Sequence, residues 1–323
     1  MEHHEEAQLI IVDRLGISPR GSFAIFRASD TLIGRALYMA KRLEGRPVAD
    51  ALRQDVERDV RMWTEQQIQP RLVTLLAGDD HASEVYAEQK GRWAGRLGIE
   101  FEMVRLQPTC TEEDLIARID HLNRDSSVHG IMLEMPLPRG IDAQRVVSAI
   151  HAFKDVDGMS PCHSFAKPSP EAALYPATPL ACIRLLKHYG YQLRGADVTL
   201  IGCGQTVGMP LLHLLIAEGA TVAACHEWTK DVASHLQRSE IAIVAVGKAG
   251  LLQADLVHPR LTVVDVGISE GDEGEVLGDL SAEAAAQTAA YTPTPGGVGA
   301  VTTVQIFANL MHAMALQREA GLI

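Results

Sequence analysis

Two patterns of apolar residues recur along the chain, and each predicts one kind of element. Between Thr31 and Ile68, apolar side chains recur every three or four residues among charged ones, which predicts an amphipathic helix. The residues of this stripe are Val48, Leu52, Val56, Val60 and Trp63. Elsewhere, short and almost wholly apolar runs predict buried strands.

Strands and helices alternate from residue 71 onward, so we expect an α/β protein with parallel sheets. Strands are expected at 71–77, 100–106, 128–134, 197–201, 221–225, 241–246 and 262–266. Helices are expected before Gly98 and at 111–123, 142–152, 179–189 and 302–318. Prolines gather between residues 161 and 179, which places a hinge near Thr178. The first domain is then 1–177, completed by segment 302–323, the second is 178–301, and two crossings are expected to join them.

Composition limits the class of protein. The chain has 323 residues, 47% of them hydrophobic, and a formal net charge of −12, which argues against nucleic acid or a membrane as partner. No apolar run reaches transmembrane length and the N-terminus is acidic, so we expect a cytoplasmic protein. The five cysteines lack C-x-x-C spacing, which indicates reduced thiols and no metal site. His3 and His4 could bind a metal, although a solvated tail is the simpler interpretation.

The first candidate chemistry follows the strand at 71–77. Tyr86 and Lys90 lie four residues apart on a predicted helix, so they share one face. A lysine there is a candidate proton donor or acceptor, and the tyrosine is placed to orient it or to stack on a flat ligand. Surface packing of the lysine stem on the ring is the commoner explanation of such a pair.

Two carboxylates are further candidates. Glu134 ends a predicted strand, and ligands of parallel sheets bind at the carboxyl ends of strands. Asp157 is placed to hydrogen-bond a heterocycle, but an Asx turn before Gly158 explains it equally well.

A glycine-rich turn in the second half indicates dinucleotide binding. Gly202, Cys203, Gly204 and Gly208 form a G-x-G-x-x-x-G turn between a strand and a helix. Glu227 follows the next strand, where a carboxylate commonly accepts from the adenosine ribose. Two later strands end at Gly247 and just before Ile268, which we add to the cofactor site. The expected fold class is therefore α/β, a small parallel-sheet catalytic domain plus a Rossmann-type dinucleotide-binding domain.

Five segments, in this order, resemble the signatures of the methylenetetrahydrofolate dehydrogenase/cyclohydrolase family. They are Gly78–Ser83 with Tyr86 and Lys90, Met135–Pro138, Lys154–Gly158, Asp265–Ile268 and Pro293–Gly299. The resemblance covers about residues 42–318.

By this resemblance Lys90 is the catalytic lysine, Tyr86 stacks on the folate and Asp157 binds the pterin. The residues expected to line the folate site are Pro295, Gly296, Gly297, Val298 and Gly299. The resemblance also implies an active site in a cleft between the domains, a nicotinamide cofactor, a tetrahydrofolate one-carbon derivative as substrate and a homodimer built through the Rossmann domains.

Glu134 departs from the family pattern, which has a glutamine before the Pro-Leu-Pro. In the family that amide resembles a partner of the catalytic lysine. A carboxylate there would favour the charged ammonium of Lys90 and weaken it as a proton acceptor, whereas hydride transfer depends mainly on positioning. We therefore expect dehydrogenase activity with weak or absent cyclohydrolase activity. In the alternative, Glu134 faces away from Lys90 or is protonated.

The cofactor turn departs as well. Cys203 and Gly204 replace an arginine and a serine of many members, and Glu227 and Trp228 replace a serine and a basic residue. Because the replaced arginine and serine resemble ligands of a 2′-phosphate, and glutamate repels that phosphate, we expect NAD in preference to NADP.

Three functions remain open. The leading one is oxidation of 5,10-methylenetetrahydrofolate to 5,10-methenyltetrahydrofolate. The second is the bifunctional dehydrogenase/cyclohydrolase, and the third is a catalytically silent folate- or nucleotide-binding subunit. The segment Pro176–Ala181, which departs from the family's Pro-Cys-Thr-Pro-x-Gly, leaves room for a specialised paralogue.

Overall fold

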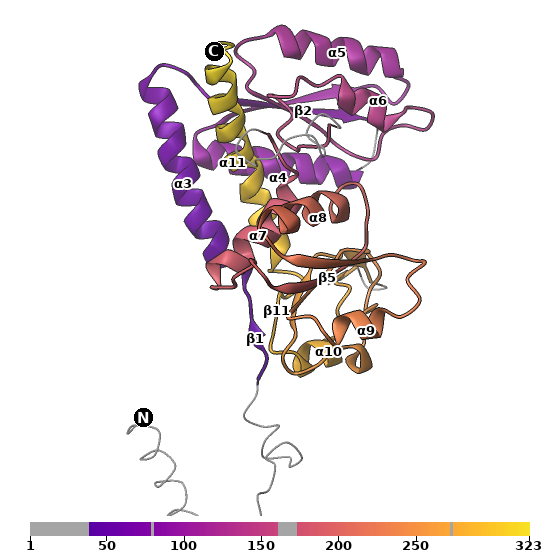
Figure 1. Cartoon of the computed structure of the whole chain (residues 1–323). Helices are drawn as coiled ribbons and strands as arrows, with labels where there is room; N and C mark the ends of the chain where they lie inside the picture. The colour runs from indigo at the N-terminus through magenta and orange to yellow at the C-terminus, as the bar shows by residue number, and fades with distance from the viewer. Residues whose placement is uncertain (1–38, 79–80, 161–172, 272–273) are drawn as a thin grey trace, which may run out of the picture. The chain divides into compact units, whose positions relative to one another are not determined.

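The computed structural model describes residues 39–78, 81–160, 173–271 and 274–323. The predictions for His3 and His4, and for the start of the first amphipathic helix, lie outside these residues. Residues 40–323 form one unit, whose elements are labelled in Figure 1.

A three-stranded parallel sheet forms the centre of the first lobe. It consists of β2 (Arg71–Ala77), β3 (Glu100–Leu106) and β4 (Gly130–Leu133) in the order β3-β2-β4. One face packs on α5 (Glu112–Arg124) and α6 (Ala143–Ser148), and the other on α4 (His81–Leu97). The strands and helices predicted here are confirmed to within a few residues.

The amphipathic stripe lies on α3, which spans Gly45–Glu65. All five stripe residues are buried, and Trp63 is 2% exposed. Within the described residues the helix begins at Gly45, and residues 39–44, which the prediction included in it, are not helical: Lys41 and Arg42 form β1.

A six-stranded parallel sheet forms the second lobe. Its strands are β5 (Asp197–Ile201), β6 (Thr221–Cys225), β7 (Ile241–Val244), β8 (Thr262–Asp265) and β11 (Ala290–Tyr291), with β1 at the edge. The order is β1-β11-β8-β7-β5-β6, so the direction of winding reverses between β5 and β7. This doubly wound arrangement confirms the predicted fold class, and such a reversal is where open α/β sheets bind ligands.

Helices cover both faces of this sheet. On one face lie α7 (Ala177–His188) and α8 (Gly208–Ala217). On the other lie α9 (Val232–Leu236), the 3₁₀ helix η3 (Ala254–Leu256) and α10 (Ala282–Gln287). A short antiparallel pair, β9 (Ser269–Glu270) and β10 (Val276–Leu277), stands apart from the main sheet.

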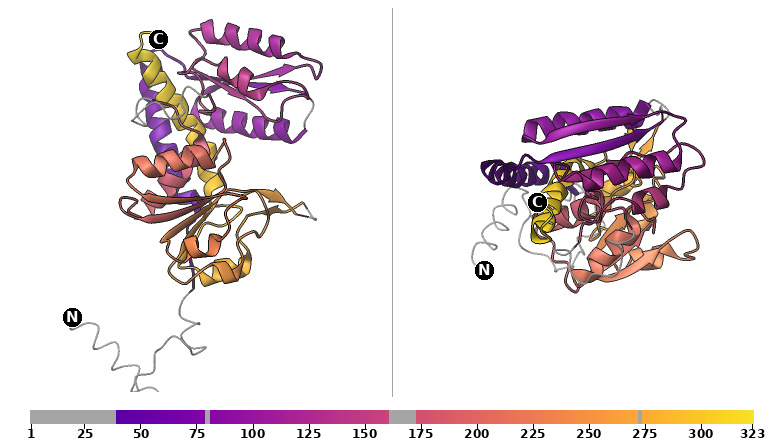
Figure 2. Two further views of the ribbon diagram at one scale, coloured as in Figure 1. Left: turned by 45° about the vertical axis from the view of Figure 1, so that its right-hand side comes forward. Right: turned by 90° about the horizontal axis from the view of Figure 1, so that it is seen from above.

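The last helix, α11 (Val298–Glu319), joins the two lobes and begins four residues earlier than predicted. It contacts α3, α7 and β4, and Figures 1 and 2 show it alongside α3. By length and composition α11 is apolar enough to cross a membrane, yet 61% of its apolar window is buried, as in the core helix of a soluble protein.

The lobes are joined differently from the prediction. Because β1 pairs with β11, Lys41 and Arg42 belong to the six-stranded sheet, although the sequence placed them in the first domain. The order of the described elements therefore requires three passages between the lobes, after β1, before α7 and before α11.

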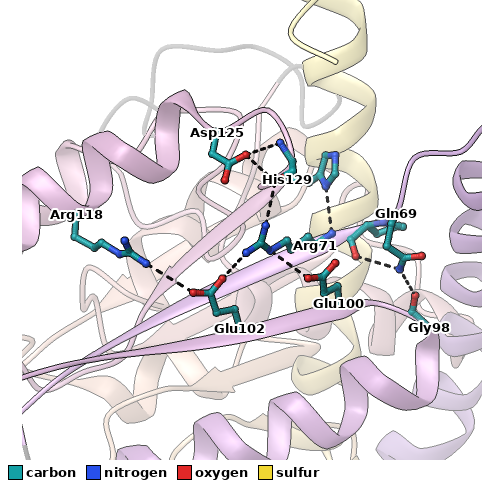
Figure 3. A network of polar contacts seen from close by, with 10 residues as sticks. Gln69, Arg71, Gly98, Glu100, Glu102, Arg118, Asp125 and His129 are labelled. Atoms are coloured by element: carbon teal, nitrogen blue, oxygen red, sulfur yellow. Dashed lines mark hydrogen bonds and ion pairs between the residues drawn. The ribbon is translucent and has the colours of Figure 1, made fainter.

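A polar network holds the strands together at their amino ends (Figure 3). Arg71 binds Glu102 at 2.5 Å and Glu100 at 3.6 Å, and its backbone N–H donates to His129 Nδ1 at 3.2 Å. The hydrogen bond to Glu102 is the main cause that raises the pKa of Arg71. This network lies at the end of the sheet opposite to the predicted ligand site, so we assign it to the fold.

Candidate active site

A lysine–carboxylate pair lies at the carboxyl edge of the three-stranded sheet. Lys90 Nζ lies 2.7 Å from Glu134 Oε1 and 2.8 Å from Oε2, and Thr74 Oγ1 donates to Glu134 Oε1 at 3.0 Å. Glu134 is 7% exposed, so each charge offsets the desolvation of the other. The alternative that Glu134 faces away from Lys90 is wrong.

The periodicity of strand and helix explains why these side chains meet. Alternate residues of a strand share a face, so Thr74 points the same way as Leu72, which lies in the core with α3 and α4. Glu134 lies two residues after Met132, which is in the same core, so its side chain points to the same face of the sheet. Its backbone N–H donates to β2 and so continues the strand pairing. Lys90 lies on α4, which covers this face.

Asp157 approaches the pair from a loop. Burial raises the pKa of the half-buried Asp157 carboxyl, the Lys90 ammonium opposes this rise, and the Glu134 carboxylate adds to it. Both charges act on Asp157, so the three groups form one electrostatic cluster.

The turn after Asp157 is built by a different aspartate. Asp155 is 1% exposed and accepts from Ser160 N at 2.6 Å, and the backbone N–H groups of Met159 and Gly158 also donate to it. Burial raises the pKa of Asp155 to about 7. The side-chain hydrogen bond of this turn thus belongs to Asp155 rather than to Asp157, for which the Asx turn was the alternative. The pKa of Asp157 responds instead to the charges of Lys90 and Glu134.

Tyr86 presents an open ring one helical turn before Lys90. Its side chain is 56% exposed, which leaves the ring available for stacking. Ser83 Oγ donates to Met135 O at 2.7 Å, which ties the first turn of α4 to the loop after Glu134. Since the Lys90 ammonium is bound to Glu134, an ordinary surface lysine does not describe this pair.

The glycine turn between β5 and α8 has the close packing that a dinucleotide turn needs. Gly202 has φ +99°, and a Cβ there would overlap the Ala245 carbonyl. A Cβ on Gly208 would overlap the Gly202 carbonyl. By contrast, no heavy atom lies within 4 Å of a Cβ built on Gly204, so its missing side chain leaves room for a ligand.

The neighbouring loop is held by an aspartate that sequence reasoning missed. Asp279 is fully buried and accepts from the backbone N–H groups of Val246 (2.7 Å), Gly247 (3.1 Å) and Lys248 (2.6 Å). This carboxylate fixes Gly247 beside the reversal point of the sheet. In the sequence, the position of Asp279 directly after Gly278 is the feature that could have indicated this role.

Asp265, which ends β8, organises the next loop. It accepts from the backbone N–H groups of Gly267, Asp279 and Leu280 at 3.0–3.1 Å, and burial raises its pKa to about 6. Ile268 beyond it is 62% exposed. The Asp265 carboxylate is therefore used inside the protein, while the Ile268 side chain is open to a ligand.

Glu227 lies near the glycine turn. Its charge adds to the effect of burial in raising the pKa of Cys203, whose Sγ donates to Cys225 O at 3.6 Å. The predicted cofactor residues at this edge are thus brought together by the pairing of β5 with β6.

The loop predicted to line a folate site leads into α11. Gly296 has φ +104°, and its carbonyl accepts from Gly45 N at 2.8 Å, which places the loop against the start of α3. Val298 and Gly299 lie in the first turn of α11, and Val298 is 3% exposed. The Val298 side chain is therefore part of the core.

A cavity of about 490 Å³ opens between the two lobes. Its lining includes Met135 and Gly158, which directly follow Glu134 and Asp157 in the chain, whereas Tyr86, Lys90, Glu134 and Asp157 themselves are not among the lining residues. The opposite wall includes Gln205 and Thr206 of the glycine turn. Residues of the two lobes thus line one cavity.

Two contributors were not predicted from the sequence. Thr74 is the one polar residue inside an otherwise apolar strand after Arg71, and Asp279 stands in a loop directly after Gly278; both are weak signals. Among the described residues, no group of three or more His, Cys, Asp or Glu side chains is placed to hold a metal ion.

Comparison with known proteins identifies both lobes. Residues 43–157 match the family model described as tetrahydrofolate dehydrogenase/cyclohydrolase, catalytic domain. Residues 176–318 match the NAD(P)-binding domain of the same family. The two matched ranges correspond to the two lobes apart from β1 and the connections.

Individual relatives agree with this assignment. The bifunctional protein FolD of Heliobacterium modesticaldum is 44% identical over 279 residues, covering 86% of this chain and 97% of the relative. The crystal structure of the bifunctional enzyme FolD from Campylobacter jejuni aligns with a TM-score of 0.81 at 32% identity, covering 85% and 99% of the two chains. The Trypanosoma brucei enzyme, complexed with NADP and an inhibitor, aligns with a TM-score of 0.78 at 28% identity, covering 87% and 99%. The resemblance inferred from the five sequence segments is confirmed: the chain belongs to the tetrahydrofolate dehydrogenase/cyclohydrolase family.

Proposed function

We propose that this chain oxidises 5,10-methylenetetrahydrofolate to 5,10-methenyltetrahydrofolate, with NAD preferred over NADP, and hydrolyses the methenyl product weakly or not at all. The observation that carries this proposal is the Lys90–Glu134 pair, whose charges act on Asp157, together with a cavity lined by Met135, Gly158 and two residues of the glycine turn.

Each residue of the cluster has a role in the proposed reaction. Asp157 hydrogen-bonds the pterin and Tyr86 stacks on the substrate, which together hold the methylene carbon in place. The loop Pro295–Gly299 lines the folate site through its backbone. A nicotinamide cofactor at the reversal point of the six-stranded sheet supplies the hydride acceptor, and the protein contributes chiefly alignment.

Glu134 separates the two activities of the family in this proposal. Both oxygens of the Glu134 carboxylate lie within hydrogen-bond distance of Lys90 Nζ, so the lysine is engaged by this partner rather than open to the substrate. Hydrolysis of the methenyl product, to which this lysine would contribute, is therefore weak or absent in this proposal. Oxidation, which needs positioning, is retained.

Gly202, Cys203, Gly204 and Gly208 hold the pyrophosphate of the cofactor, with Gly247 and Ile268 beside the nicotinamide. Glu227 favours NAD, because its carboxylate repels a 2′-phosphate and accepts from a free 2′-hydroxyl. The proposal further includes a homodimer through the NAD(P)-binding domain and a cytoplasmic location, without nucleic acid or membrane as partner.

The proposal is tested by turnover of methylenetetrahydrofolate with NAD and with NADP, following reduced cofactor and methenyl-folate separately. We expect NAD-dependent turnover in which methenyl-folate accumulates. Equal kcat/KM with both cofactors would contradict the preference for NAD. Binding without turnover would favour a silent subunit.

The second candidate is the bifunctional enzyme, which the names of the FolD relatives favour. Glu134→Gln separates the two candidates, since the amide keeps the shape of the side chain but not its charge. We expect this variant to hydrolyse methenyl-folate at least about tenfold faster than the parent, as a general acid or base contributes about 100- to 10,000-fold. Rapid hydrolysis by the parent and no gain in the variant would establish the bifunctional reading.

A further inference from the structure

The turn after β6 exposes an indole that the proposed reaction does not use. Trp228 is 79% exposed and, with Glu227, occupies the corner of a turn that runs from His226 to Thr229. Thr229 N donates to His226 O at 2.9 Å, Trp228 N to His226 Nδ1 at 3.2 Å, and His226 N to Thr229 Oγ1 at 3.0 Å. Three hydrogen bonds thus fix the backbone that carries the indole.

This turn stands at the same edge of the sheet as the glycine turn. Ile201 and Cys225 are partners in the pairing of β5 with β6, and Gly202 N donates to Cys225 O at 2.9 Å. The Cys203 Sγ donates to the same carbonyl at 3.6 Å. The strand end that carries Glu227 and Trp228 is therefore bonded directly to the first two residues of the glycine turn.

Large aromatic side chains are rarely left so exposed, because an indole contributes most to stability or binding when at least one face of the ring is covered. The other two tryptophans follow this rule: Trp63 is 2% exposed and Trp93 is half-buried against the core. A flat ligand on the indole would cover the exposed ring of Trp228.

We propose that Trp228 stacks on the adenine of the dinucleotide cofactor, so that it and Glu227 together bind an adenosine with a free 2′-hydroxyl. This inference rests on the proposed placement of the cofactor at the glycine turn. It assigns the base to the indole and the ribose to the neighbouring carboxylate. Much of the affinity then comes from the adenosine half of the cofactor, away from the reacting nicotinamide.

The first test is tryptophan fluorescence, because Trp228 is the exposed one of three tryptophans. We expect AMP, ADP-ribose and NAD to quench the emission, and nicotinamide mononucleotide to leave it unchanged. The quenching should disappear in Trp228→Phe, although calorimetry should still detect AMP binding by that variant. Quenching that persists in Trp228→Phe would overturn the inference.

The second test measures affinity. If the adenine stacks on the indole, Trp228→Ala should lower the affinity for AMP and for NAD by about 5- to 100-fold. Trp228→Phe, which keeps a ring, should stay within about threefold of the parent, and Ile216→Ala, an exposed apolar residue on α8, should match the parent. Equal affinity of Trp228→Ala and the parent for AMP would overturn the inference.

Turnover separates this inference from the proposed function. In saturating NAD, Trp228→Ala should retain the kcat of the parent while its KM for NAD rises, because the indole is remote from the nicotinamide. An unchanged KM for NAD overturns the stacking role and leaves the dehydrogenase assignment standing. A parent without turnover overturns the dehydrogenase assignment, while AMP binding that depends on Trp228 still supports the inference.

Discussion

At the scale of single residues, Lys154 shows how a buried charge orders the approach to the site. It is 4% exposed, and its Nζ donates to the backbone carbonyls of Leu122 (3.0 Å), Asn123 (2.9 Å) and Asp125 (2.7 Å) at the end of α5. An ammonium there satisfies carbonyls that have no partner within the helix. It thereby fixes the start of the segment that ends at Asp157.

Asp155, next to Lys154, should make stability depend on pH. The pKa of its carboxyl is raised from 3.8 to about 7 by burial. The folded chain therefore binds this proton more tightly than the unfolded chain. The contribution of the Asp155 proton to the free energy of unfolding is fully present below the unfolded pKa and is lost as the pH rises to about 7. The side chain of Asp155→Asn cannot ionise. We therefore expect the free energy of unfolding of the parent to fall relative to that of the variant as the pH rises across this range.

Urea unfolding of the two proteins at a series of pH values measures this difference. The slope of the difference against pH carries the test, because the amide accepts backbone hydrogen bonds less well than a carboxylate and shifts the variant at every pH. A difference that stays constant from pH 3.8 to 7 would show that the Asp155 carboxyl titrates normally.

At the scale of elements, α11 carries a row of buried amides that bind backbone of the first lobe. Gln317 Nε2 donates to His129 O and Phe153 O, both at 2.7 Å. Asn309 Nδ2 donates to Val156 O and Tyr175 O, both at 2.8 Å. The helix thus fixes both the strand end and the residue just before Asp157.

Removing the Asn309 amide should destabilise the fold and loosen the site. Asn309 is 2% exposed, and Asn309→Ala leaves the buried Val156 carbonyl and the partly buried Tyr175 carbonyl without this donor, which costs about 1–3 kcal/mol for the first and less for the second. We expect the free energy of unfolding to fall by about 2–4 kcal/mol, and the KM for the folate substrate to rise because Val156 O is released beside Asp157. Urea unfolding and steady-state kinetics measure the two effects.

Glu319→Ala is the matched control on the same helix. Glu319 is exposed at the end of α11, so its loss should change the free energy of unfolding by less than about 0.5 kcal/mol. If Asn309→Ala were no more destabilising than this control, the Asn309 hydrogen bonds would contribute nothing net.

At the scale of the whole molecule, locally encoded features could be predicted and long-range contacts could not. The stripe ending at Trp63 and the turn at Gly202 can be recognised from short stretches of sequence, because helix periodicity and turn chemistry are local. The contact of Glu134 with Lys90 joins residues 44 apart and depends on strand register, which the sequence does not state. The sequence therefore identified both residues without deciding whether they touch.

Very short elements were also beyond prediction. β1 and β11 have two residues each, too few for any periodicity, and they form because neighbouring strands offer backbone partners. This is why the third connection between the lobes was missed. Thr74 was missed for the opposite reason, because one threonine in an apolar strand leaves the periodic pattern intact.

The junction between the lobes allows a sharp test with two glycines. Gly45, which begins α3, donates to Gly296 O at 2.8 Å, and a Cβ on Gly45 would overlap the Gly297 carbonyl. Gly45→Ala must push the loop before α11 away from α3, and we expect it to lower the free energy of unfolding by about 1–3 kcal/mol, as overpacking does. Thermal or urea unfolding measures the change.

Gly95→Ala is the control, because it is the same substitution where nothing opposes it. Gly95 is exposed within α4, and no heavy atom lies within 4 Å of its Cβ position. Alanine is a better helix former than glycine, so the free energy of unfolding of this variant should rise by about 0.5–1 kcal/mol. Opposite signs for the two variants are expected only if the lobes are in close backbone contact at Gly45. Two stabilising substitutions would contradict the close backbone contact between the start of α3 and the loop before α11.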